Sequence, residues 1–183
     1  KQVLNLVIDD DQSIVVFSSA IKNTHPMRKF FEFNKALSIK RAEFLGLISA
    51  QYDVIAIAGT HGKTTISTML THILKVGGVD CSAFLGGISK NYNSNFLLGS
   101  SNIMVIEADE YDKSFFYLKP KVILISALDR DHSDTYPTFL EMQKAYAQFI
   151  SNSQPHLSQL ILKESLPFKF LDVPAILDYS LSR

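Results

Sequence analysis

A short glycine-bracketed loop constrains this 183-residue chain more than any other feature. Residues 53–65 read Asp-Val-Ile-Ala-Ile-Ala-Gly-Thr-His-Gly-Lys-Thr-Thr, so an apolar run ends in a glycine loop followed by a lysine. Such glycines let backbone N–H groups approach phosphate oxygens, the lysine adds a positive charge, and the next hydroxyl can bind magnesium. The pattern predicts a phosphate-binding P-loop made of Gly59, Thr60, His61, Gly62, Lys63, Thr64 and Thr65.

The residues on either side of this loop have the pattern that a P-loop requires. The apolar residues 54–58 predict a buried strand before it, and a helical apolar spacing predicts a helix over residues 64–75 after it. One spacing differs from the common P-loop, because Ile57 stands where the first glycine usually lies. The loop is therefore a shortened variety. The residues expected on the apolar helix face are Ile66, Met69, Leu70, Ile73 and Leu74.

The rest of the chain alternates predicted strands and helices. Strands are expected at residues 3–8, 14–17, 103–106, 122–126 and 159–163, and helices at residues 26–37, 41–50 and 137–150. Residues 86–101 are rich in Gly, Asn and Ser and predict a loop. This alternation indicates an α/β fold with a mostly parallel sheet flanked by helices.

Composition excludes several classes of function. Eighteen basic and eighteen acidic residues cancel, so no overall field favours nucleic acid or an anionic membrane. No apolar run approaches the length of a membrane span, and the first residues lack the apolar stretch of a signal peptide. Cys81 is the only cysteine and predicts a small buried side chain rather than a disulfide or zinc site. We therefore expect a cytoplasmic protein with no nucleic-acid or membrane partner.

Carboxylates gather directly after two of the predicted strands. Residues 107–112 read Glu-Ala-Asp-Glu-Tyr-Asp, and residues 129–134 read Asp-Arg-Asp-His-Ser-Asp. The carboxyl ends of parallel strands meet at one sheet edge, so both clusters should face the P-loop. Carboxylates would repel a nucleotide triphosphate unless a divalent cation lay between them, and Mg²⁺ takes oxygen ligands. Thr64 and Glu107 are the predicted ligands. A role of these acids, Glu107 included, in capping helices or lining a solvated loop remains an open alternative, as does a structural role for His132.

Three motifs in this order resemble the bacterial cell-wall Mur ligases, most closely the branch that adds L-alanine. They are Gly59-Thr60-His61-Gly62-Lys63-Thr64-Thr65, Glu107-Ala108-Asp109-Glu110 and Asp131-His132-Ser133-Asp134-Thr135-Tyr136. Residues 14–21 also look like the end of that family's N-terminal domain. The resemblance implies an incomplete P-loop ATPase domain over residues 51–183. It is preceded, over residues 1–50, by the tail of a Rossmann-like domain that binds the uridine nucleotide. The family's C-terminal domain is expected to be absent, and the fragment itself to be inactive.

The resemblance also implies a reaction and its participants. In Mur ligases a substrate carboxylate attacks the ATP γ-phosphate, and an amine then attacks the resulting acyl phosphate. The cofactors would be ATP and Mg²⁺, and the substrates would be UDP-N-acetylmuramate and L-alanine. The protein would be a monomer or a weak homodimer. By resemblance, Lys63 and His132 are catalytic, and Thr64, Glu107 and His132 bind metal. Ser18, Ser19 and His61 are placed near the substrate.

Two alternatives remain open. Glu-Ala-Asp-Glu-Tyr-Asp, with Tyr111, also resembles the ligase that recycles murein tripeptide onto UDP-N-acetylmuramate, whereas residues 113–115 and 132–136 favour the alanine-adding branch. From a different class, a nucleotide-binding regulator or simple NTPase could use the same P-loop without forming an amide bond.

Overall fold

The computed structural model describes residues 14–129, 135–164, 166, 168 and 176–179. The chain divides into two compact units, the first ending at Leu45 and the second beginning at Gly46. This division lies inside helix α2 (Arg41–Ser49).

The first unit pairs two short strands and carries one helix. β1 (Ile14–Phe17) and β2 (Leu37–Lys40) run parallel, and α1 (Pro26–Phe33) connects them. The helix begins at Pro26, where His25 accepts a hydrogen bond from the Met27 amide at its N-terminus. α1 ends at Phe33, because Lys35 adopts a left-handed φ of 53° and the residues from Leu37 pair in β2. The helix expected over residues 26–37 is therefore too long. The strand expected at residues 3–8 lies outside the described residues.

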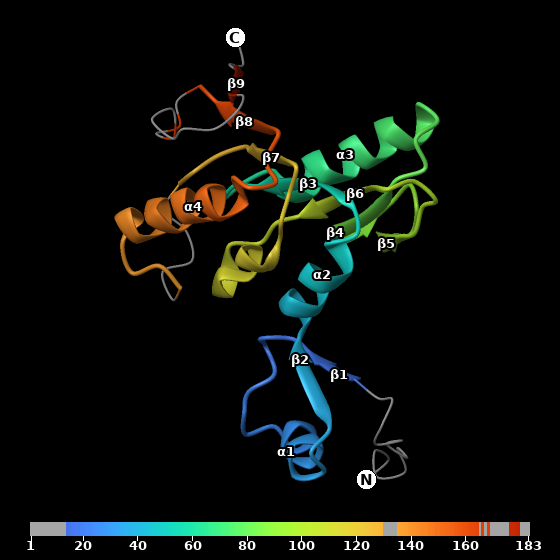
Figure 1. The fold of residues 1–183 in the computed structure, drawn as a ribbon, viewed down its shortest axis with the longest axis vertical. Helices are drawn as coiled ribbons and strands as arrows, with labels where there is room; N and C mark the ends of the chain where they lie inside the picture. The colour runs from blue at the N-terminus through green and yellow to red at the C-terminus, as the bar shows by residue number, and fades with distance from the viewer. Residues whose placement is uncertain (1–13, 130–134, 165, 167, 169–175, 180–183) are drawn as a thin grey trace. The chain divides into compact units, whose positions relative to one another are not determined.

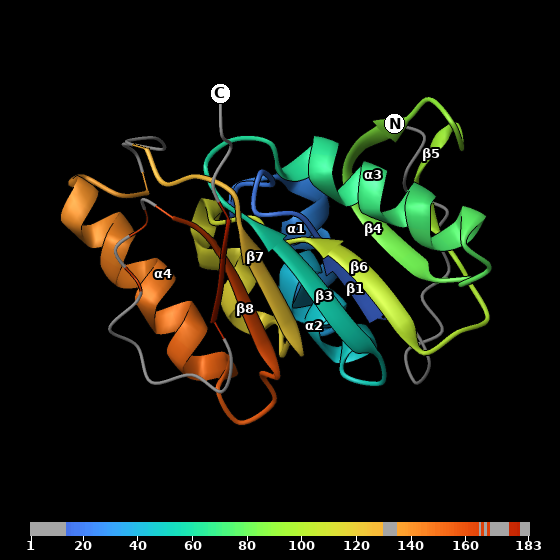
Figure 2. The ribbon, with the colours of Figure 1, turned by 90° about the horizontal axis from the view of Figure 1, so that it is seen from above.

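The second unit is built around a seven-stranded sheet in the order β5-β4-β6-β3-β7-β8-β9 (Figure 2). Every pairing is parallel except β4 with β5, so the predicted α/β class with a mostly parallel sheet is confirmed. Its strands are β3 (Asp53–Ala58), β4 (Ser82–Ser89), β5 (Ser94–Leu97), β6 (Ile103–Glu107), β7 (Val122–Ile125), β8 (Gln159–Lys163) and β9 (Ile176–Tyr179). Its remaining elements are α3 (Lys63–Val76), the 3-10 helix η1 (Tyr111–Tyr117) and α4 (Phe139–Ser153).

Helices cover the sheet on both sides. Figure 1 shows α3 along one side and η1 along the other. This follows from the topology, because right-handed connections that move across a sheet in opposite directions place their helices on opposite faces. η1 packs against α4 through Phe115, whose ring stacks on Phe149 with centroids 4.6 Å apart. None of the helices in the described parts of the chain has the length and apolar character of a membrane span.

The face of α3 that meets the sheet is the expected one only in part: Ile66, Leu70 and Leu74 pack against the core cluster, as predicted. Ser67 and Thr71 are fully buried there, and the Thr71 hydroxyl donates to the Ser67 carbonyl. Met69 and Ile73 are 57% and 63% exposed, so their predicted burial is wrong. Small side chains let the helix lie close to the sheet, which turns these two larger residues outward. Cys81 is buried in the adjoining hydrophobic cluster, as predicted.

The loop expected over residues 86–101 is also wrong. Ser82–Ser89 forms β4, which pairs parallel with β6 and antiparallel with β5. Asn93, with a left-handed φ of 50°, lies in the turn between β4 and β5. Buried Ala83 and Leu85 hold β4 in the sheet despite the glycines that follow, so tertiary packing overrides the local turn signal. The last strand, β9, was not predicted.

Candidate functional site

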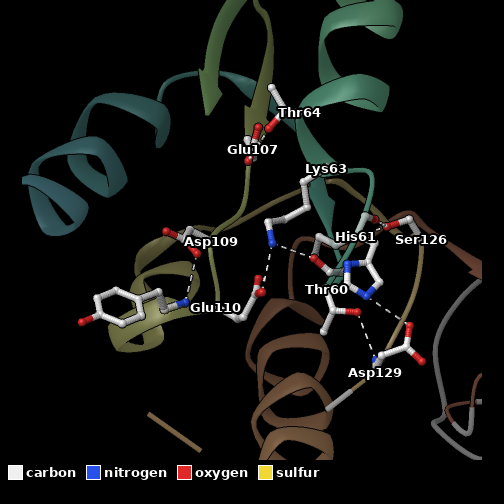
Figure 3. Close-up of polar contacts among 12 residues, drawn as sticks. Thr60, His61, Lys63, Thr64, Glu107, Asp109, Glu110, Ser126 and Asp129 are labelled. Atoms are coloured by element: carbon white, nitrogen blue, oxygen red, sulfur yellow. Dashed lines mark hydrogen bonds and ion pairs between the residues drawn. The ribbon is translucent and has the colours of Figure 1, made fainter. Parts of the chain in front are cut away.

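Three neighbouring strands bring the predicted motifs to one edge of the sheet. β3, which leads into the P-loop, lies between β6 and β7. Ile57 pairs with Glu107, and Ala58 pairs with Ile125. The segments after all three strands therefore meet at the carboxyl end of the sheet, where ligands bind in open α/β folds (Figure 3).

Both glycines of the P-loop adopt conformations that other residues rarely enter. Gly59 has a φ of +124° and Gly62 a φ of +81°. A side chain at Gly59 would also collide with the Ser126 hydroxyl. Gly62 precedes the first turn of α3, where no side chain caps the helix. The free N–H groups and positive dipole of that helix end are suited to bind an anion.

Contacts with the segment after β7 hold the loop in place. The Thr60 amide donates to the Ala127 carbonyl at 3.0 Å, and the Asp129 amide donates to the Thr60 hydroxyl at 3.0 Å. The Ser126 hydroxyl donates to the His61 carbonyl. Ser126 was expected only as the last residue of a strand. Its role in closing the loop has no signal in the sequence, because it depends on which strands are neighbours.

Lys63 extends across the loop and is bound at its tip. Its ammonium donates to the Gly59 carbonyl at 2.8 Å and forms an ion pair with Glu110 Oε1 at 2.9 Å (Figure 3). The Lys63 side chain is 13% exposed and that of Glu110 is fully buried. The sequence predicted that Lys63 belongs to the P-loop. It did not distinguish Glu110 from the other acids of residues 107–112.

Thr64 and Glu107 form a second side-chain contact between the start of α3 and the end of β6. The Thr64 hydroxyl donates to Glu107 Oε1 at 3.0 Å, and the Gly86 amide donates to Glu107 Oε2 at 2.8 Å. A side chain at Gly86 would meet that carboxylate, which would then have to move away from the Gly86 amide. The hydroxyl and carboxylate oxygens are hard ligands of the kind Mg²⁺ takes. Within the described residues, no group of three or more His, Cys, Asp or Glu is gathered to hold a metal.

Other predicted site residues lie farther from this pair. His61 Nε2 lies 3.5 Å from Asp129 Oδ2, and both side chains are about two-thirds exposed, at 65% and 66%. Asp109 points away from the loop in Figure 3 and accepts a hydrogen bond from the Tyr111 amide at 3.0 Å. His132 lies outside the described residues, so its predicted catalytic and metal-binding roles stay predictions.

Two buried tyrosines lie behind the Lys63–Glu110 pair. The Tyr136 hydroxyl donates to the Glu110 backbone carbonyl at 2.7 Å. Burial raises the pKa of Tyr136 and of Tyr146, and the negative charge of Glu110 raises both pKa values further. Both hydroxyls therefore stay neutral at physiological pH and can act as hydrogen-bond donors.

The first unit contains a cavity of its own beside Ser18. The Ser18 hydroxyl accepts a hydrogen bond from the Ala20 amide at 3.2 Å, whereas Ser19 is exposed. The Arg28 guanidinium lies over the Phe17 ring, 4.3 Å from its centroid. The cavity measures about 490 Å³ and is lined by Val15, Phe17, Ser18, Ile21, Arg28 and Phe31, among others. Binding of a uridine nucleotide by Ser18 and Ser19 stays a prediction.

The match to a known domain covers this whole edge of the sheet. Residues 57–170, more than half of the chain, match the Mur ligase middle domain. The chain belongs to the Mur ligase family. The matched residues run from the end of β3, through the P-loop and Glu107, to beyond β8.

Curated relatives extend the match beyond that domain. A UDP-N-acetylmuramate--L-alanine ligase of Porphyromonas gingivalis (strain ATCC BAA-308 / W83) is 44% identical over 156 residues, which cover 85% of this chain and 34% of that protein. The protein of the same name from Christiangramia forsetii is 36% identical over 159 residues, covering 87% of this chain and 35% of that protein. This Mur ligase sequence therefore spans about a third of the length of the relatives it matches.

Solved structures share the fold at low sequence identity. The Neisseria meningitides UDP-N-acetylmuramate:L-alanyl-gamma-D-glutamyl-meso-diaminopimelate ligase superimposes with a TM-score of 0.76 at 21% identity, covering 88% of this chain and 57% of that chain. For the Thermotoga maritima UDP-N-acetylmuramate-alanine ligase the TM-score is 0.73 at 22% identity, covering 85% and 36%. The Thermotoga maritima MurF ligase in complex with ADP gives 0.57 at 14% identity, covering 89% and 46%.

Proposed function

We propose that the full-length protein carrying this sequence is an ATP-dependent ligase that joins L-alanine to UDP-N-acetylmuramate. One observation carries this proposal: Lys63, Thr64 and Glu107 meet at one sheet edge in a chain of the Mur ligase family. The choice of substrates is supported by relatives named UDP-N-acetylmuramate--L-alanine ligase at 36% to 44% identity.

The P-loop residues fit a nucleotide. Bound ATP would supply the phosphoryl group that activates a substrate carboxylate for attack by an amine. The N–H groups of the loop other than that of Thr60, which donates to the Ala127 carbonyl, would bind its phosphate oxygens, and α3 would direct its positive end toward them. The Lys63 ammonium would offset the negative charge that spreads over the transferred group. Support comes also from the structural neighbour that holds ADP.

Thr64 and Glu107 fit a magnesium ion. Their oxygens lie 3.0 Å apart, and the Gly86 amide fixes the orientation of the carboxylate. The ion would supply Lewis acidity and charge compensation at the phosphate oxygens. His132 is proposed as the ligand of a second metal and as a catalytic residue. Ser18, Ser19 and His61 are proposed to contact the substrate.

The recycling ligase is the second candidate, because the segment containing Tyr111 resembles both branches. Likeness to its Neisseria structure does not decide between them, since at 21% identity it shows the fold alone. The two branches differ in the amine that they use. L-alanine is expected to support turnover and the tripeptide L-alanyl-gamma-D-glutamyl-meso-diaminopimelate is not.

The test is acceptor-dependent phosphate release. A full-length protein with this sequence is incubated with ATP, Mg²⁺, UDP-N-acetylmuramate and L-alanine, each also omitted in turn. We expect phosphate only when all four are present, together with a new amide product seen by mass spectrometry. Steady ATP hydrolysis without either acceptor would instead identify a simple NTPase.

A further inference from the structure

Glu110 is a fully buried carboxylate next to the phosphate loop. It follows β6 and has no exposed side-chain surface. Removing a charge from water is costly unless a partner of opposite charge and further hydrogen bonds compensate it. Here the partner is the Lys63 ammonium, 2.9 Å away. Burying the Glu110 carboxylate beside Lys63 has a desolvation cost that an acid in a solvated loop would not have.

Two acceptors bind the Lys63 ammonium group and fix its orientation. An ammonium group has three N–H donors. One is directed to the Gly59 carbonyl at 2.8 Å and another to Glu110 at 2.9 Å. These two acceptors belong to different strand ends, after β3 and after β6, so the nitrogen is held between two rigid elements. Among the described residues these are the two acceptors that Lys63 contacts, which leaves one donor for a ligand in the loop.

Glu110 is itself held from behind by aromatic side chains. The Tyr136 hydroxyl donates to its backbone carbonyl at 2.7 Å, and Tyr136 is only 2% exposed. Tyr146 of α4 is fully buried beside the carboxylate, as its raised pKa reflects. Phe115 of η1 packs edge-on against the Tyr146 ring, with centroids 5.3 Å apart. The acid therefore has little freedom to follow a lysine that moves.

We propose that Glu110 is a positioning residue: its buried carboxylate holds the Lys63 ammonium so that the remaining N–H is directed at the phosphoryl group being transferred. This inference rests on the proposed function, since it requires a nucleotide in the P-loop. It gives Glu110 a role different from that proposed for Glu107, which lies on the opposite side of Lys63 in Figure 3.

Kinetics of the full-length ligase test the proposal. Glu110→Gln keeps the shape and an acceptor oxygen but removes the charge, and Glu110→Asp keeps the charge but shortens the reach. We expect kcat to fall about 10- to 100-fold in both variants, with the ATP KM changed less than about threefold, because positioning acts in the transition state. Glu164→Gln, an exposed acid in the same unit, is the control and should retain wild-type kcat. A Glu110→Gln enzyme with wild-type kcat would overturn the proposal, as would a loss confined to KM.

A second measurement does not depend on turnover. In a crystal structure of the wild-type protein with Mg²⁺ and a non-hydrolysable ATP analogue, Lys63 should contact the γ-phosphate while staying within about 3.2 Å of Glu110. A lysine that leaves Glu110 to reach the phosphate would show that the acid sequesters it instead, and would refute the proposal. If wild-type protein releases no phosphate with both acceptors, the proposed ligase function fails. The bound-analogue structure then still decides the role of Glu110.

Discussion

The Thr64 hydroxyl donates a hydrogen bond of 3.0 Å to Glu107 Oε1, although the two residues lie 43 positions apart in the chain. Thr64 lies in the first turn of α3, and Glu107 ends the neighbouring strand β6. Because β3 and β6 are adjacent and parallel, a hydroxyl and a carboxylate meet where the phosphates of a nucleotide are expected.

Glu107→Gln should weaken the use of magnesium by a full-length ligase. The amide still accepts a hydrogen bond from Thr64 but no longer offers a charged oxygen to the ion. We expect the Mg²⁺ concentration for half-maximal phosphate release to rise at least about tenfold, since even changes to residues that only support metal ligands reduce metal affinity by about that factor in other proteins. Titration of turnover with Mg²⁺ measures it, and an unchanged midpoint would argue against Glu107 as a ligand.

Gly86→Ala should disturb Glu107 through the backbone. The new methyl group would occupy the space of the Glu107 carboxylate, so the acid must move away from the Gly86 amide. The carboxylate is the end of a flexible side chain, so its movement relieves the clash with little change in the free energy of unfolding. We expect instead that the Mg²⁺ concentration for half-maximal phosphate release rises, measured by titration of turnover in the full-length ligase.

The neighbouring Gly87→Ala is the matched control. A methyl group there makes ordinary contact with the Thr64 methyl at 3.5 Å, and the Mg²⁺ midpoint should stay unchanged. Equal effects of the two variants would mean that displacement of Glu107 is not their cause.

Lys63→Met should abolish turnover and also destabilise the fold. Removing the ammonium leaves Glu110 buried without its ion-pair partner, which should cost about 3 kcal/mol. The double variant Lys63→Met with Glu110→Gln should recover most of this stability, because no uncompensated charge remains. Phosphate release should stay absent in both. Activity restored in the double variant would show that Lys63 acts only through the fold.

Asp80 should make stability depend on pH at the far end of α3. Its carboxylate accepts hydrogen bonds from Lys75 at 2.6 Å and from the Ser100 amide at 2.9 Å, which lower its pKa from 3.8 to about 2. The folded state therefore favours the charged form. Its contribution is present above about pH 4 and is lost as the pH falls toward 2.

The test compares Asp80→Asn with the wild type in thermal unfolding. At pH 7 the variant should melt at a lower temperature, and the difference should shrink as the pH falls from about 4 to about 2. Glu164→Gln, an exposed acid elsewhere in the unit, should show no such convergence. A difference that persists below pH 2 would exclude the charge of Asp80 as its cause.

Short-range sequence patterns were enough to predict the elements whose conformation follows from the residues next to each other in the chain. The apolar run of β3, the glycines of the P-loop and the helix over residues 63–76 each follow from short-range sequence patterns. The predicted length of helix α1 was too great, because no local sequence pattern predicted the left-handed conformation of Lys35. The strand β4 was missed because its glycines have the local pattern of a turn, whereas its stability comes from pairing with β6.

The sequence by itself determined that this chain carries a phosphate-binding loop, an α/β fold, and acids placed after parallel strands. Tertiary structure alone decided which acid is buried beside Lys63, namely Glu110, and that the Gly86 amide holds the Glu107 carboxylate. The physical reason is that strand order and backbone approach join residues 47 and 21 positions apart. Spacing along the chain carries no record of which strands become neighbours or which charge becomes buried.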